Sequence, residues 1–148
     1  MTTTVSQLLE TKGSHGSQIW SVAAQAPVQA AMQLMADKDI GAVMVVEGDR
    51  LVGIFSERDY ARKVGLKGLA PETPVSAVMT SDVVWVTPEQ SIEACMALMT
   101  TKFIRHLPVL AQGRVAGMVT IRDVVKAIVS DRDGTIRSLE TYLSSLTM

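Results

Sequence analysis

The 148-residue chain is long enough for one domain of ordinary size, or for two small units that share a core. Hydrophobic residues make up 47% and charged residues 20%, a globular balance, and the formal charge of -1 gives no overall attraction to nucleic acid or anionic lipid. With one cysteine and no apolar run approaching a membrane span, we expect a cytoplasmic protein with no disulfide and neither a membrane nor a nucleic-acid partner.

The chain begins with an N-terminal extension, residues 1–18, which carries the apolar residues Val5, Leu8 and Leu9. A β-rich piece follows at 19–22, and after it a helix is expected. The apolar residues of this helix recur at the i, i+3, i+4, i+7 spacing of one buried face. They are Val28, Ala31, Met32 and Met35.

Two apolar runs, residues 42–46 and 51–55, then flank a Glu-Gly-Asp-Arg turn, which predicts a β-hairpin. The second run leads into a helix expected at 57–64. One unit of order β-α-β-β-α therefore spans residues 19–66, and a linker containing Gly and Pro follows at 67–75.

The same unit occurs again over residues 76–130, with its first strand expected at 83–86. A single gapless offset pairs Met32 with Met96, Leu34 with Leu98, Met35 with Met99, Gly53 with Gly117, Arg58 with Arg122 and Asp59 with Asp123. Self-similarity of this length indicates two copies of one supersecondary unit, and hence an α+β fold. The remaining residues, 131–148, predict a C-terminal helix that packs on its own domain or pairs with another subunit.

The most similar stretch of the two copies lies where the second hairpin strand meets the closing helix. It reads Gly53-Ile54-Phe55-Ser56-Glu57-Arg58-Asp59 in the first copy and Gly117-Met118-Val119-Thr120-Ile121-Arg122-Asp123 in the second. A hydroxyl and free N–H groups at a helix start favour an anion, and arginine adds a forked donor for phosphate. Aspartate is a natural acceptor for ribose hydroxyls. The pattern therefore suits a nucleotide.

Helix capping explains the same spacing without any ligand. Ser56 with Asp59, and Thr120 with Asp123, match the capping box, in which a hydroxyl and a carboxylate satisfy N–H groups at the helix start. Such boxes are common, so spacing alone favours capping. Capping and ligand binding are nevertheless compatible at one junction.

These features together resemble the CBS domain, a family whose members occur as tandem pairs with a Gly-hydrophobic-x-Ser/Thr-x-x-Asp signature closing each motif. The resemblance covers about residues 19–130 and includes the Arg105-His106-Leu107-Pro108-Val109 stretch of the second motif. It extends to small bacterial proteins that are little more than one such pair. It implies two motifs packed through their sheets as a pseudo-twofold pair, with two clefts for AMP, ADP, ATP, NAD or S-adenosylmethionine.

The resemblance also implies roles for individual residues. The two aspartates, Asp59 and Asp123, would hold ribose hydroxyls. The side chains that would face phosphate are Ser56, Thr120, Arg58 and Arg122. The backbone that would contact adenine belongs to Ile40, Gly41 and Ala42 in the first motif and to Ile104, Arg105 and His106 in the second.

One difference between the copies predicts that the clefts are unequal. Arg105 and His106 stand where the first copy has Gly41 and Ala42, so only the second copy places this pair beside its cleft and the cationic donors are unequally shared. We expect one cleft to bind a phosphate-bearing ligand more tightly, or to be the only one occupied. Lys12, from the N-terminal extension, is a candidate for supplying the missing cation.

The sequence thus predicts a non-enzymatic regulatory module that senses an adenine nucleotide and acts on an unidentified protein. No nucleophile, base and orienting group occur at a spacing typical of catalysis, and no Cys/His cluster indicates a metal site, so neither a catalytic cofactor nor a metal is expected. The alternative is an assembly module whose capping boxes bind nothing. In that case the apolar faces form a homodimer, as CBS pairs often do, and a homodimer is the expected state of the sensor as well.

Overall fold

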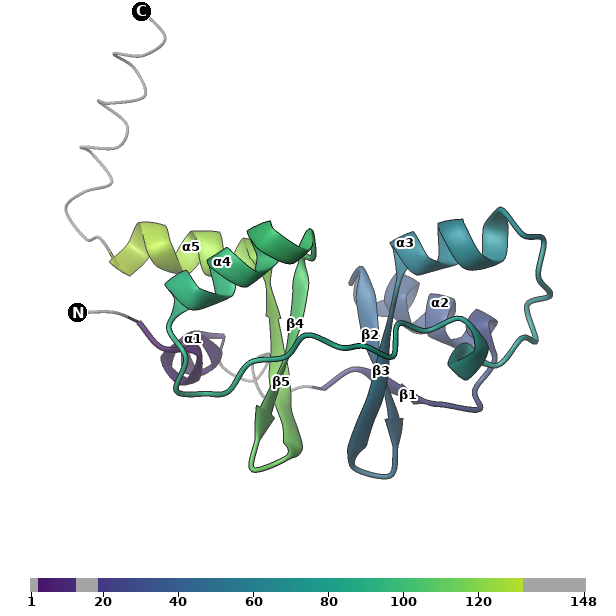
Figure 1. Cartoon of the computed structure of the whole chain (residues 1–148), viewed down its shortest axis with the longest axis horizontal. Coiled ribbons are helices and arrows are strands. Elements are labelled where there is room, and N and C mark those ends of the chain that lie inside the picture. The colour runs from purple at the N-terminus through teal and green to yellow at the C-terminus, as the bar shows by residue number, and fades with distance from the viewer. Residues whose placement is uncertain (1–2, 13–18, 132–148) are drawn as a thin grey trace, which may run out of the picture.

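The structure is a computed structural model that describes residues 3–12 and 19–131 (Figure 1). The helix predicted over 131–148 lies outside the described residues, apart from residue 131 at its start. The first element is α1 (Val5–Thr11). It starts with a capping box, because the Thr4 hydroxyl accepts from the Gln7 N–H at 3.2 Å and the Gln7 side chain accepts from the Thr4 N–H at 3.0 Å.

The first motif is built on a three-stranded sheet of order β1-β2-β3, in which β1 is parallel to β2 and β2 is antiparallel to β3. Its elements are β1 (Ser21–Ala23), α2 (Val28–Lys38), β2 (Ala42–Glu47), β3 (Arg50–Ser56), α3 (Glu57–Asp59) and a π-helical continuation, η2 (Tyr60–Gly65). The predicted order β-α-β-β-α is therefore confirmed. The closing helix is present, but its hydrogen-bonding pattern changes after α3.

The second motif repeats this plan with one strand fewer. Its elements are α4 (Ile92–Lys102), β4 (His106–Ala111), β5 (Arg114–Thr120) and α5 (Ile121–Asp131). The strand predicted at 83–86 is reduced to one parallel bridge between Val86 and Val109. The prediction of a full strand there is wrong.

Two prolines are the physical reason for the missing strand. In the first motif the Met44 N–H donates to the Trp20 carbonyl at 3.1 Å, but Pro108 occupies the position of Met44 in the second copy and has no N–H for the matching bond to Val84. At the other end the Ala24 N–H donates to the Val46 carbonyl at 3.2 Å, and Pro88, at the position of Ala24, cannot make the matching bond to Leu110. The ladder is thus limited to the two bonds around Val86.

The N-terminal segment packs on the second motif, although it directly precedes the first. The Val5 N–H donates to the Gln90 carbonyl at 2.8 Å, and the Ser6 N–H donates to the Pro88 carbonyl at 2.9 Å. Val5 and Leu8 are buried in the same hydrophobic cluster as the core of the second motif. The segment 3–12 is therefore part of that core.

The segment between the motifs makes the matching contacts with the first motif. It contains η3 (Val75–Ala77), and the Val75 N–H donates to the Ala26 carbonyl at 2.8 Å. Val75 and Val78 lie in the core of the first motif, and Thr80 exchanges two backbone hydrogen bonds with Ile54 of β3. Each motif is thus completed by the segment that precedes the other one.

The two hairpins, β2–β3 and β4–β5, stand side by side in the middle of the molecule, with α2 and α3 beside the first and α4 and α5 beside the second (Figure 1). Residues of β3 contact residues of β5. The described residues contain two apolar clusters, one in each motif. The α+β pair of motifs joined through their sheets is confirmed, and its junction is the place where ligand-sized cavities form.

Candidate functional site

Two cavities of similar size lie between the motifs. We name them by the junction hydroxyl that lines each. The Thr120 cavity, of about 530 Å³, and the Ser56 cavity, of about 540 Å³, are both large enough for a small organic ligand. Each combines the strand-to-helix junction of one motif with the helix-to-strand segment of the other, so neither motif could form a cavity of this kind alone.

The helix-to-strand segments reach the cavities because α2 and α4 end in the same way. Asp39 and Phe103 adopt left-handed backbone conformations, with φ of 54° and 56°, and so turn the chain sharply at the helix ends. The next residue donates back to the helix in both motifs, Ile40 to the Met35 carbonyl and Ile104 to the Met99 carbonyl. This turn places residues 40–42 and 104–106 at the junction between the motifs.

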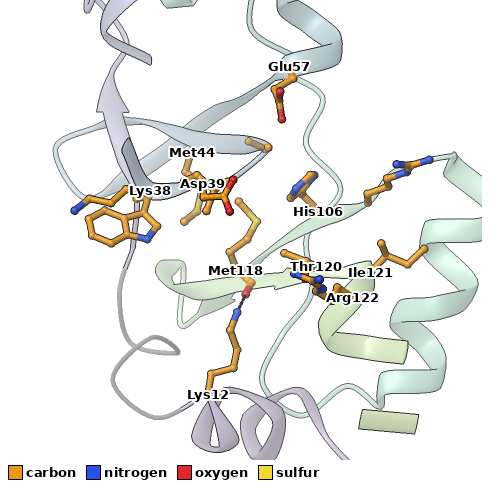
Figure 2. A pocket seen from close by; sticks show the side chains of 15 residues that line it. Lys12, Lys38, Asp39, Met44, Glu57, His106, Met118, Thr120, Ile121 and Arg122 are labelled. Carbon is orange, nitrogen blue, oxygen red and sulfur yellow. Dashed lines mark hydrogen bonds between the residues drawn. The ribbon is translucent and has the colours of Figure 1, made fainter. Parts of the chain in front are cut away.

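All but one of the residues proposed from sequence line a cavity. The Thr120 cavity is lined by Lys12, Ile40, Gly41, Ala42, Arg105, His106, Thr120 and Arg122, and the Ser56 cavity by Gly41, Ala42, Ser56, Arg58, Asp59, Ile104, Arg105 and His106. The exception is Asp123, whose Oδ2 accepts from Lys12 Nζ at 2.9 Å. Lys12 Nζ also donates to the Met118 carbonyl at 3.0 Å (Figure 2).

One premise of the predicted asymmetry is wrong. Arg105 and His106 were expected beside a single cleft, but both residues line both cavities. The segment lies between the two cavities because it follows α4 directly into the junction of the two sheets. Any difference between the cavities must therefore come from residues that line only one of them.

Sequence reasoning missed several such residues. In the Thr120 cavity they include Met44, Met118 and Lys38, whose Nζ lies 4.5 Å from the centre of the Trp20 ring (Figure 2). In the Ser56 cavity they include Arg62, Thr80, Lys102 and Phe103. Lys38 and Lys102 had a usable signal, since both end a repeat helix just before the segment expected to contact adenine. Thr80 had none, because tertiary contacts alone bring it there. Trp20 also lines the Thr120 cavity; from the sequence it could have bordered either a cleft or the surface.

The capping boxes predicted as the ligand-free explanation are present. At the first junction the Asp59 N–H donates to Ser56 Oγ at 3.1 Å, and Asp59 Oδ2 accepts from the Ser56 N–H at 3.0 Å. The second junction repeats this with Thr120 and Asp123 at 3.1 and 3.0 Å. The signature residues therefore hold the helix starts in the absence of ligand, and any ligand must bind alongside these caps.

His106 is the titratable group at the centre of the site. Its side chain is half-buried, and this burial lowers the pKa of the imidazole below 6.5. The neighbouring positive charge of Arg105 lowers the pKa further, and the negative charge of Asp123 opposes the shift. Near neutral pH His106 is therefore an uncharged donor and acceptor, and Arg105 is the fixed positive charge of the segment.

The lowered pKa of His106 predicts the sign of a pH effect on stability. Between the folded pKa and 6.5 the unfolded chain binds more protons than the folded one, so protonation favours unfolding. The contribution of His106 to the free energy of unfolding is therefore at its maximum above about pH 6.5 and decreases as the pH falls. The free energy of unfolding of the wild type should drop more between about pH 7 and 5.5 than that of His106→Asn, measured by urea titration. Parallel curves for the two proteins would contradict the assignment.

Other chemistry-bearing groups give no sign of a further site. Cys95 is buried in the second core, and burial raises the pKa of its thiol, so it is a poor nucleophile. Within residues 3–12 and 19–131, no three His, Cys, Asp or Glu side chains come together as ligands for a metal ion. None of the helices that the structure describes is long and apolar enough to cross a membrane.

Comparison with known proteins gives consistent matches. The family model of the CBS domain matches residues 16–65 and 75–130. The CBS domain-containing protein CBSX3, mitochondrial, of Arabidopsis thaliana is 36% identical over 149 residues, covering 95% of this chain and 72% of that protein. YhcV of Bacillus subtilis, another CBS domain-containing protein, is 34% identical over 113 residues, covering 76% of this chain and 81% of that protein.

Solved structures agree with these sequence matches. A CBS-domain protein from Burkholderia ambifaria superposes with a TM-score of 0.83 at 46% identity, covering 88% of this chain and 96% of that one. A CBS domain protein from Pyrobaculum aerophilum, complexed with AMP, has the same fold, with a TM-score of 0.71 at 23% identity over 81% of this chain and 88% of that one. The two motifs, their shared sheet junction and these matches place the chain in the CBS-domain family, as a tandem pair that forms a regulatory module.

Proposed function

We propose that this protein is a non-enzymatic cytoplasmic sensor that binds an adenine nucleotide, AMP, ADP, ATP or NAD, between its two motifs. The observation that carries the proposal is the composition of the cavities. Each brings a junction hydroxyl and arginine from one motif, Thr120 and Arg122 or Ser56 and Arg58, against the helix-to-strand segment of the other. Donors for phosphate from one motif therefore face the backbone segment proposed to contact adenine from the other.

The lining of the Thr120 cavity contains groups for both parts of a nucleotide. Its cationic side chains include Lys12, Lys38, Arg105 and Arg122, which favour phosphate. Its apolar and aromatic side chains, Ile40, Met44, Met118 and Trp20, suit the flat face of a purine. The AMP complex of the Pyrobaculum aerophilum protein is consistent with this assignment.

Regulation follows from the position of the cavities. A ligand that contacts both motifs stabilises one relative packing of β3 and β5 over others, in proportion to its difference in affinity for them. This change in packing would alter the surface that a protein partner or a second copy of the chain binds. This mechanism requires binding and no bond-making step.

A thermal-shift panel of AMP, ADP, ATP, NAD and S-adenosylmethionine tests the proposal. A ligand at about 100 times its Kd stabilises the native state by about 2.7 kcal/mol, which raises the Tm by about 5–10 °C for a chain of this size. Guanosine and cytidine monophosphates are the matched controls, since they carry the same phosphate and ribose. The absence of any shift at millimolar concentrations of all five compounds would rule out the proposed function.

An assembly module is the second candidate, and one observation favours it. Both capping boxes are complete without a ligand, and α5 exposes two apolar side chains, Ile121 and Val125, with 36% and 46% of their surface accessible. In this case the chain forms a homodimer through its helices and is indifferent to nucleotide. Sedimentation velocity with and without AMP distinguishes a ligand-independent dimer from a ligand-responsive one.

A further inference from the structure

The two signature aspartates occupy equivalent positions but differ in how fully they are paired. Asp59 Oδ2 accepts from the N–H and the hydroxyl of Ser56 at 3.0 and 3.1 Å. Asp59 Oδ1 accepts from the Thr80 hydroxyl at 3.1 Å and pairs with Lys63 Nζ at 3.2 Å. A carboxylate has about four acceptor positions, so the protein itself occupies those of Asp59.

Asp123 retains acceptor capacity. Its Oδ2 accepts from the Thr120 N–H at 3.0 Å and from Lys12 Nζ at 2.9 Å. In the described ranges 3–12 and 19–131, no hydrogen bond reaches Asp123 Oδ1. The second copy has Ala127 where the first has Lys63, so the cation on Asp123 has to come from elsewhere in the chain.

Lys12 supplies that cation through a single side chain. Lys12 also donates to the Met118 carbonyl at 3.0 Å. In the first motif the donor to the equivalent carbonyl, that of Ile54, is a backbone group, the Thr80 N–H at 2.8 Å. Freeing Asp59 Oδ1 requires two side chains to turn away from the same oxygen, the hydroxyl of Thr80 and the amine of Lys63. Freeing Asp123 requires only rotation of the Lys12 side chain, which has a flexible four-carbon stem.

The position of Lys12 places it between Asp123 and the ligand space. Lys12 lines the Thr120 cavity and Asp123 does not. Figure 2 shows the Lys12 side chain extending from the end of α1 toward Met118. Both partners keep some solvent access, with 23% and 20% of their side-chain surfaces exposed. A ribose that uses both carboxylate oxygens of Asp123 can therefore bind only if the lysine amine leaves Oδ2.

We propose that Lys12 is the specificity-determining residue of the Thr120 cavity: its amine leaves Asp123, whose carboxylate then binds the ribose, and pairs instead with the phosphate of the incoming ligand. This inference rests on the proposed function. A nucleoside displaces Lys12 and offers its amine no new anion, whereas a nucleotide replaces the lost ion pair with another. Lys12 therefore selects phosphorylated ligands, and the Thr120 cavity fills before the Ser56 cavity, whose aspartate is already paired.

Calorimetric titration of adenosine and AMP into the full chain tests this role. In Lys12→Met the stem is kept and the amine is lost, so adenosine should bind about fivefold more tightly and AMP about fivefold more weakly than in the wild type. Lys12→Arg keeps the charge and should retain the preference for AMP. Arg114→Met is the matched control for charge, because Arg114 belongs to a highly exposed ion pair with Asp49 and lines neither cavity.

Each outcome of this experiment supports or overturns a definite claim. A fall in the AMP-to-adenosine preference in Lys12→Met, but not in Arg114→Met, supports the role of Lys12. An unchanged preference in a folded Lys12→Met protein overturns that role and leaves nucleotide binding intact. If neither compound binds the wild type, the proposed function fails and the role of Lys12 fails with it. A melting curve of each variant confirms that it is folded, and Lys12→Arg repeats the test should Lys12→Met not fold.

Discussion

Asp123→Ala is expected to weaken the binding of adenine nucleotide by about 100-fold. A hydrogen bond to a charged group contributes about 1.5–3 kcal/mol, and two ribose hydroxyls on one carboxylate would contribute at least about 3 kcal/mol together. The carboxylate is the acceptor that the Thr120 cavity offers to a ribose once Lys12 has moved aside. Calorimetric titration of AMP into the wild type and the variant measures the difference.

Asp59→Ala is the matched control for this substitution. Both variants lose the carboxylate of a capping box, which should lower the free energy of unfolding by about 1 kcal/mol in the absence of ligand. Asp59→Ala should be the more destabilised of the two, because it also loses the contacts with Thr80 and Lys63, whereas Asp123→Ala loses the contact with Lys12. Only Asp123→Ala should lose the first binding event, because the oxygens of Asp59 are already paired with Ser56, Thr80 and Lys63. Equal losses of affinity in the two variants would show that the cavities are equivalent. A dimer that ignores nucleotide in wild type and variants alike would favour the assembly module.

Leu8→Ala is expected to lower the free energy of unfolding by about 3 kcal/mol. Leu8 is only 2% exposed and lies in the hydrophobic cluster of the second motif, so its truncation removes buried surface and leaves a cavity. The loss is large for a residue so near the N-terminus, because the segment before the first motif completes the core of the second. Urea unfolding followed by circular dichroism measures it.

Leu66→Ala provides the comparison for this prediction. It makes the same chemical change at a leucine that is 84% exposed, and should alter stability by less than about 0.5 kcal/mol. A small effect at both positions would mean that the N-terminal segment is not part of the core in solution. A large effect confined to Leu8 would show that residues 3–12 belong to the folded core of the second motif.

Local patterns were enough to predict the motifs. The helix that became α2 and the hairpin strands that became β2 and β3 follow from the spacing of apolar residues, and spacing depends only on neighbours along the chain. The repeat then extended this plan to the second copy. The exception is the strand expected at 83–86, where Pro88 removes a donor just after the segment and Pro108 removes one on a strand more than twenty residues further along.

The candidate site was only partly predictable. The junction residues Ser56 and Thr120 were found because both copies carry a hydroxyl at the same place, and the family resemblance suggested the segments at 40–42 and 104–106. Which junction faces which segment did not follow from either, since each cavity combines residues of different motifs. Thr80 also entered the site through tertiary contacts that no local pattern indicates.

By itself, the sequence determined that the chain consists of two copies of one α+β unit with a capped junction in each, because periodicity and capping are local properties. Only the tertiary structure decided that the segment before each motif completes the other motif. For the same reason it alone decided how the aspartates differ: Asp59 is held by Lys63, four residues away, whereas Asp123 is held by Lys12, 111 residues away. A contact at such a separation depends on how the N-terminal segment packs on the second motif.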